Sequence, residues 1–249
     1  MKENETSYFE FFSGYVPSGE IFLMAADEIV EIATQNSDAV NFTKNKLCII
    51  GLVSYFEAFV KDHFSSVLSI APALIEKVKD FGYSTDIPAE EAFEFRDTLR
   101  YRIGFLIGQR LDFGTAKKIN ALYTAVIKIT PFGRSEANQF DRLLRDRNFI
   151  VHHGGTYTTS YIKQAFSEID PEHRRPHGDT IEISVDKVVE TAMFLKTIAH
   201  STIVASSNKL RAMLSSENTM TTELEKAIDA MQWWSEKDNE QKGKDGQGV

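Results

Sequence analysis

The chain has 249 residues, of which 42% are apolar and 26% charged, so it can bury the core of one large domain or two small ones. Its net charge of −8 argues against a protein that simply coats nucleic acid or an anionic membrane. A single cysteine, Cys48, excludes an internal disulfide framework and a cysteine-rich zinc site. The polar N-terminus is unlike a signal peptide, and the most apolar stretch, residues 47–60, is too short for a membrane span. We therefore expect a soluble, cytoplasmic protein that does not bind a membrane.

The basic residues are concentrated in the middle of the chain. Residues 96–147 contain 11 basic and 5 acidic side chains, whereas the rest of the chain contains 17 basic and 31 acidic ones. A local positive field can hold a polyanion even on an acidic protein. The alternative is that these cations lie on solvated helix faces and pair with nearby carboxylates, and charge alone favours this alternative.

Helical periodicity dominates the first part of the chain. Ser18 and Ser135 are expected to cap the first and last of these helices, and Gly154-Gly155 is expected to end the last one. The long second helix has one apolar side and carries Glu57 on its flank. The predicted helices cover residues 18–34, 40–69, 73–81, 89–107, 115–129 and 135–153.

The remainder of the chain differs in composition. Residues 156–162 and 180–184 are predicted to form two short strands on either side of a polar loop. A last long helix is expected at residues 186–214, and a short amphipathic segment at residues 222–234. The charged tail, residues 236–249, has almost no apolar residues and is expected to be disordered.

These elements predict a mainly α fold, a helical bundle with a small β-hairpin insert before the last long helix. The bundle would occupy residues 18–214, after an N-terminal extension at residues 1–17. Residues 215–249 would hold the amphipathic segment and the tail.

The helix at residues 135–153 carries the most informative pattern, FDRLLRDRNFIVHH from residue 140 onward. On a helical wheel, Arg147 falls in the middle of an apolar face, whereas His152 belongs to a separate polar stripe. The two side chains meet only if the helix loosens at its glycine end or a second copy supplies one of them. The apolar face contains Phe140, Leu143, Leu144, Ile150 and Val151, and the polar stripe contains Asp141, Arg145, Asn148 and His152.

An arginine on a core-facing stripe has two interpretations. It can form a buried ion pair, for which Glu57 is the natural partner, or it can point into a cleft and bind an anion. His152 beside two glycines can likewise be a simple helix-end histidine, which the helix dipole favours there. The pattern alone leaves both interpretations open.

Residues 147–152, Arg-Asn-Phe-Ile-Val-His, resemble the Arg-x(4–6)-His motif of the HEPN superfamily (higher eukaryotes and prokaryotes nucleotide-binding domains). The similarity is to the form in which a polar residue follows the arginine and an aliphatic residue precedes the histidine. The context also fits, because the motif lies in a late helix and Glu57 lies in a long earlier one. The resemblance extends over about residues 18–214, although only the motif helix carries it residue by residue. Arg145 with His152 and Arg147 with His153 also satisfy the spacing.

The resemblance implies a metal-independent endoribonuclease that works as a homodimer, with the motif helices of two protomers forming one cleft. The 2′-OH of RNA would attack the adjacent phosphorus and leave a 2′,3′-cyclic phosphate and a 5′-hydroxyl. His152 would act as general base or acid, Arg147 would stabilise the transition state, and Asn148 would orient the imidazole or hold a phosphate oxygen. The resemblance further implies that Arg145 and His153 bind RNA and that Glu57 forms a supporting ion pair.

RNA and a second copy of the chain are thus the expected partners, and a toxin or phage-defence effector would also have an antitoxin or regulatory protein. No cofactor and no metal are expected, since Arg174-Arg175 would repel a cation from His173 and His177. Two alternatives to this prediction remain. In the first, the chain is a non-catalytic HEPN module that binds RNA, nucleotide or a protein partner. In the second, it is a helical interaction protein in which Arg147 has only a structural role.

Overall fold

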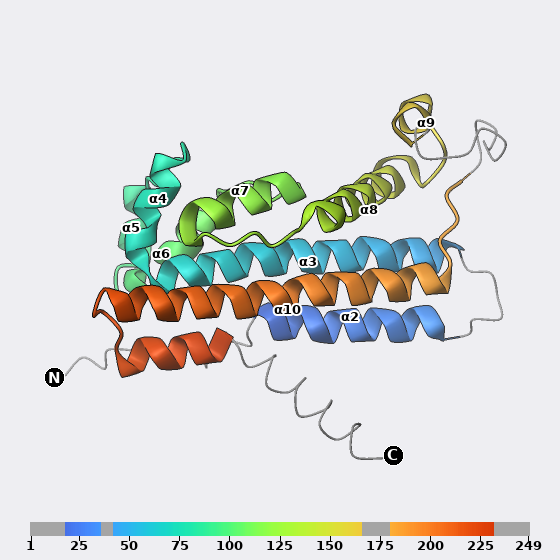
Figure 1. The fold of residues 1–249 in the computed structure, drawn as a ribbon. Helices are drawn as coiled ribbons and strands as arrows, with labels where there is room; N and C mark the ends of the chain where they lie inside the picture. The colour runs from blue at the N-terminus through green and yellow to red at the C-terminus, as the bar shows by residue number, and fades with distance from the viewer. Residues whose placement is uncertain (1–17, 36–41, 166–179, 232–249) are drawn as a thin grey trace, which may run out of the picture.

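A computed structural model describes residues 18–35, 42–165 and 180–231 of the chain. Three long helices run side by side in it: α2 (Ser18–Thr34), α3 (Phe42–Ile70) and α10 (Val185–Ser216) (Figure 1). α3 is the central helix, because it packs against α2, α10, α6 and α8. The described part of the chain is therefore a mainly α-helical protein built around α3.

Shorter helices cover the side of α3 that faces away from α2 in Figure 1. α6 packs against the C-terminal half of α3, and α8 lies over its N-terminal half. An additional helix, residues 222–231, returns along the bundle after α10. The short helices are η1 (Pro72–Leu74), α4 (Ile75–Asp80), α5 (Ala89–Glu94), α6 (Leu99–Gly108), α7 (Ala116–Ile127), α8 (Arg134–His153) and α9 (Thr159–Ala165).

Aromatic side chains join the layers of the bundle. Phe56 of α3 is fully buried, and its ring centroid lies 5.6 Å from that of Phe22 on α2 and 5.3 Å from that of Phe140 on α8. Phe140 also stacks on Phe132, which precedes α8, at 4.8 Å. Such ring pairs add to the free energy of apolar burial. They fix the N-terminal half of α8 on α3.

Two glycines allow α6 to lie directly on α3. Gly104 and Gly108 of α6 face Ser65 and Ser69 of α3, and the Gly104 N–H donates to Ser69 Oγ at 3.2 Å. A Cβ atom on Gly104 would overlap the backbone carbonyl oxygen of Ser65. The close approach of these two helices therefore depends on the absence of a side chain at this position.

A fully buried histidine links α3 to α10. Nε2 of His63 shares a hydrogen bond with Ser206 Oγ at 2.7 Å, and the ring is stacked against Phe59 and Tyr123 with centroid distances of 5.5 and 6.2 Å. Burial lowers the pKa of His63 to about 3, because the charged imidazolium would lose its hydration. The ring is therefore neutral in the folded protein at physiological pH.

The neutral His63 predicts a loss of stability in mild acid. Imidazoles of an unfolded chain ionise near pH 6.5, so below that pH the unfolded state binds a proton that the folded state refuses until about pH 3. The free energy of unfolding that the neutral His63 contributes is fully present above pH 6.5. Below that pH it falls by up to about 1.4 kcal/mol per pH unit. Urea unfolding of wild type and His63→Gln between pH 7.5 and 5.5 checks this. An equal pH slope in both proteins would contradict it.

Several helix boundaries follow the sequence pattern, but two details differ. The helix predicted at residues 89–107 is divided into α5 and α6 by a turn in which the Thr98 N–H donates to the Phe95 carbonyl oxygen at 2.9 Å. The Thr98 hydroxyl also bonds to that carbonyl oxygen, so it competes with a continuous helix. The cap of α8 is Gly133 rather than Ser135, because the Gly133 N–H donates to Glu136 Oε2 at 2.6 Å.

The prediction of a β-hairpin insert is wrong for the residues that the structure describes, which contain no strand. One isolated antiparallel bridge joins Thr156 to Thr180, and residues 159–165 form α9 instead of a strand. Thr158 begins this helix by accepting the Tyr161 N–H at 3.2 Å. The segment at residues 181–184 is held by α3, since Asn45 Nδ2 donates to the Ile183 carbonyl oxygen at 2.8 Å.

Other predictions fall outside the described residues. They are the N-terminal extension, the loop with His173 and His177, and the tail at residues 236–249. The amphipathic segment is described as far as residue 231 and is helical there.

α10 is long and apolar enough to span a membrane by its length and composition. In the structure it serves as a core helix, and side chains such as Leu195 and Ile198 are buried in the cluster that also contains α2 and α3 residues. The cytoplasmic location and the absence of a membrane partner stay predictions.

Candidate functional site

The C-terminal end of α8, which carries the two adjacent histidines, is anchored to its surroundings. Gly154 and Gly155 end the helix with φ angles of 61° and 82°, which glycine adopts without strain. Lys46 Nζ of α3 donates to the Gly154 carbonyl oxygen at 3.3 Å, and the Ile181 N–H donates to that of Gly155 at 2.8 Å. The position of this helix end is therefore fixed from two sides.

A cleft of about 390 Å³ runs along the outer side of α8. One wall is formed by the polar stripe of α8 together with His153. The stripe consists of Asp141, Arg145, Asn148 and His152. The opposite walls come from the start of α7 and from α9. The residues that line these walls include Gly114, Thr115, Thr158, Ser160 and Tyr161.

Tyr161 of α9 is positioned by three contacts with α8. Its ring stacks on Phe149 with a centroid distance of 4.0 Å, and the Arg145 guanidinium lies 5.7 Å from the ring centroid. Its hydroxyl donates to Asp146 Oδ1 at 2.9 Å. Burial and the neighbouring carboxylate of Asp146 raise the pKa of Tyr161, so the hydroxyl keeps its proton. The sequence reasoning missed Tyr161 because it assigned this segment to a strand.

Arg147 is not part of the cleft wall. Its guanidinium forms an ion pair with Glu57 of α3, and the two side chains are 21% and 29% exposed. Burial raises the pKa of Glu57, because the loss of hydration outweighs the favourable charge of Arg147. The Arg147 Nε atom is buried and has no hydrogen-bond partner among the described residues. This arginine therefore joins two helices, whereas His152 points to another side of α8.

Removal of Arg147 alone is expected to destabilise the protein by about 1–3 kcal/mol. That range is below the cost of breaking a fully buried pair because both side chains keep some contact with water. Arg147→Ala leaves the partly desolvated Glu57 carboxylate without its partner, so the double variant with Glu57→Ala should recover part of the loss. Urea unfolding of the four proteins in this cycle measures the coupling. Strictly additive effects would show that the pair contributes nothing.

The structure thus divides the residues that the sequence singled out into two groups. Arg145, Asn148, His152 and His153 share the cleft, whereas Arg147 and Glu57 form the ion pair on the core side of α8. Val151, which the wheel places on the apolar face of α8, is 49% exposed. It lies near the end of α8, where the neighbouring helices no longer cover this side.

The cleft brings together chemistry suited to a phosphodiester. A guanidinium binds phosphate oxygens, an amide donates and accepts hydrogen bonds, and two imidazoles can take and give protons. No group of three metal-ligating side chains occurs within the described ranges. Comparisons with protein-family models, curated protein sequences and solved structures find no match for this chain.

Proposed function

We propose that this chain is a metal-independent endoribonuclease of the HEPN type that cleaves RNA in the cleft along α8. The observation that carries the proposal is the convergence of Arg145, Asn148, His152 and His153 in one open cleft. These residues come from a single helix whose C-terminal end is anchored, so their relative positions are set before substrate binds.

In the proposed reaction, His152 takes the proton of the RNA 2′-OH as that oxygen attacks the adjacent phosphorus. A bond forms between the 2′-oxygen and phosphorus, and the bond from phosphorus to the 5′-oxygen breaks. His153 gives a proton to the departing 5′-oxygen, which becomes the 5′-hydroxyl. The other product ends in a 2′,3′-cyclic phosphate. Imidazoles suit both roles because they ordinarily titrate near neutral pH.

Arg145 serves as the arginine of the motif in this proposal. It shares the cleft with His152, and six residues separate the two, which satisfies the x(4–6) spacing. Arg145 lies 3.7 Å from the Asp146 carboxylate, whereas Arg147 forms a hydrogen-bonded ion pair with Glu57 on the core side of α8. A guanidinium in the cleft stabilises the additional negative charge on the phosphorane-like transition state. Arg147 would then act as a positioning residue that fixes α8 on α3.

The proposed homodimer has a surface that suits it. Leu47 of α3 and Val151 of α8 are 62% and 49% exposed at the end of the bundle where Lys46 meets Gly154. A second copy that covers these side chains would bring two α8 helices together. The role as a toxin or phage-defence effector, with an antitoxin or regulatory protein as its partner, belongs to the same proposal.

The direct test is incubation of the purified protein with mixed-sequence RNA in excess EDTA. We expect cleavage products with 2′,3′-cyclic phosphate and 5′-hydroxyl ends, and none with the His152→Ala/His153→Ala variant. Cleavage that requires a metal, or products with 5′-phosphate ends, would refute the proposed chemistry.

A non-catalytic RNA-binding module is the second candidate, and the Glu57–Arg147 pair favours it. The pair holds Arg147, one of the two arginines that satisfy the motif spacing, outside the cleft. In this case RNA binds to wild type without cleavage, and Arg145→Ala weakens binding while Arg147→Ala changes only stability.

A further inference from the structure

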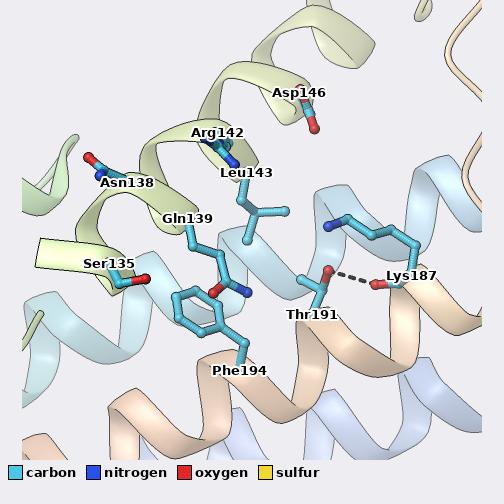
Figure 2. Close-up of a pocket in the computed structure, with 9 residues that line it drawn as sticks. All are labelled: Ser135, Asn138, Gln139, Arg142, Leu143, Asp146, Lys187, Thr191 and Phe194. Atoms are coloured by element: carbon cyan, nitrogen blue, oxygen red, sulfur yellow. Dashed lines mark hydrogen bonds between the residues drawn. The ribbon is translucent and has the colours of Figure 1, made fainter. Parts of the chain in front are cut away.

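A second pocket of about 360 Å³ lies between α8 and α10, on a different side of α8 from the cleft. Figure 2 shows that α8 contributes a row of polar side chains from its N-terminal half, and that α10 contributes Lys187, Thr191 and Phe194. On a helical wheel the centre of this row lies roughly 120° from the polar stripe of the cleft. The α8 residues of the pocket are Ser135, Asn138, Gln139, Arg142, Leu143 and Asp146.

Several polar groups in this pocket lack protein partners. The side chains of Ser135, Asn138, Gln139 and Lys187 form no hydrogen bond or ion pair with the part of the chain that the structure describes. The Lys187 ammonium extends from α10 toward Leu143, into the space between the two helices (Figure 2). Convergent polar groups of this kind, next to an apolar wall, are typical of a ligand site.

We propose that this pocket binds a small phosphate monoester that carries a planar ring. Arg142 and Lys187 supply two positive charges, and a guanidinium fits phosphate oxygens in a bidentate manner. The half-buried Phe194 ring offers a flat apolar surface, and the Gln139 carboxamide lies next to it in Figure 2. An amide that both donates and accepts pairs with the edge of a nitrogen heterocycle.

The placement of the charged and aromatic side chains orients this ligand. In Figure 2, Lys187 lies on the same side of the pocket as Asp146, whereas Phe194 and Gln139 lie on the other side. Asp146 is the one carboxylate among the described residues of the pocket wall, and it accepts the Tyr161 hydroxyl. The phosphate is therefore expected between Arg142 and Lys187, with the ring over Phe194. A free nucleotide and the phosphorylated end of a nucleic acid strand present the same chemistry.

The test is calorimetric titration of the folded His152→Ala protein with AMP, adenosine, inorganic phosphate and a 5′-phosphorylated RNA tetranucleotide. We expect AMP to bind at least ten-fold more tightly than adenosine or inorganic phosphate. A tetranucleotide that binds more tightly than AMP identifies the strand end as the ligand, and the reverse order identifies the free nucleotide. No binding of AMP at millimolar concentration, or equal binding of adenosine, would overturn the proposal.

Matched variants locate the binding. Lys187→Glu and Arg142→Glu should each weaken AMP binding at least ten-fold, whereas Lys209→Glu, an exposed lysine of the same α10, and Arg134→Glu at the start of α8 should not. Arg145→Glu alters the cleft and should leave the Kd for AMP unchanged. An unchanged Kd in Lys187→Glu, or a loss only in Arg145→Glu, would place the ligand elsewhere. This result is independent of whether the cleft cleaves RNA.

Discussion

Replacement of His152 with alanine is expected to lower the rate of RNA cleavage by about 10²–10⁴-fold, the usual contribution of a general acid or base. The imidazole lies on the polar stripe of the cleft and is exposed, so its loss should not affect folding. The measurement is the single-turnover cleavage rate of a labelled RNA in EDTA, with the urea unfolding midpoint recorded for each protein. Wild-type rates in a folded His152→Ala protein would refute the proposed role.

The two arginines of α8 provide the matched control for this experiment. Arg145→Ala should reduce cleavage and lower stability less than Arg147→Ala, because Arg145 lines the cleft and its Nε lies 3.7 Å from the adjacent Asp146 carboxylate, beyond hydrogen-bond distance. Arg147→Ala should mainly reduce stability, because its guanidinium pairs with Glu57. If the pH profile is bell-shaped and His153→Ala removes one limb, the two histidines share the acid and base roles. The opposite ranking of the arginines would assign the motif to Arg147.

Gly104→Ala is expected to lower the free energy of unfolding by at least about 3 kcal/mol, at the upper end of the usual cost of overpacking. The added methyl group would overlap the backbone carbonyl oxygen of Ser65, which no rotamer change can move. For a protein of this size the loss corresponds to a decrease of about 6–12 °C in Tm. Thermal unfolding followed by circular dichroism measures it. A Tm within about 2 °C of wild type would contradict the described α3–α6 contact.

Gly108 offers a comparison in the same helix. A Cβ atom there would overlap the Ser65 hydroxyl rather than a backbone atom, and it would lie 3.2 Å from Ser65 Cβ. Ser65→Ala should therefore rescue much of the loss in Gly108→Ala but little of the loss in Gly104→Ala. Gly114→Ala, where the nearest atom belongs to the exposed Asp112 side chain, should change stability only slightly.

The helices of this protein could be predicted from sequence because their apolar spacing persists over long stretches. α8 shows how far such reasoning reaches, since the wheel separates Arg147 from the stripe that contains Arg145, Asn148 and His152. The structure places the two sets on different sides of the helix. The partner of Arg147, Glu57, lies 90 residues away on another helix. The sequence could suggest this partner only because a glutamate occurs on the flank of the long second helix.

The errors occurred where local composition and tertiary contacts disagree. Threonine and tyrosine are enriched in strands, which led to the hairpin prediction at residues 156–162. The Thr158 cap and the stacking of Tyr161 on Phe149 favour a short helix there instead. The α8–α10 pocket could not be found from sequence, because 40 residues lie between Asp146 on one wall and Lys187 on the other, and no sequence pattern relates the two walls.

Among the described residues, one antiparallel bridge joins Thr156 to Thr180, so the two ends of the intervening segment lie side by side. The described part of that segment includes α9, which supplies Ser160 and Tyr161 to the cleft. Since closing a longer loop costs little additional entropy, residues can be added to or removed from the segment after α9 without a change in the helices on either side of the bridge. Variation among descendants of such a protein should therefore concentrate here, with substrate preference changing while the scaffold is inherited intact.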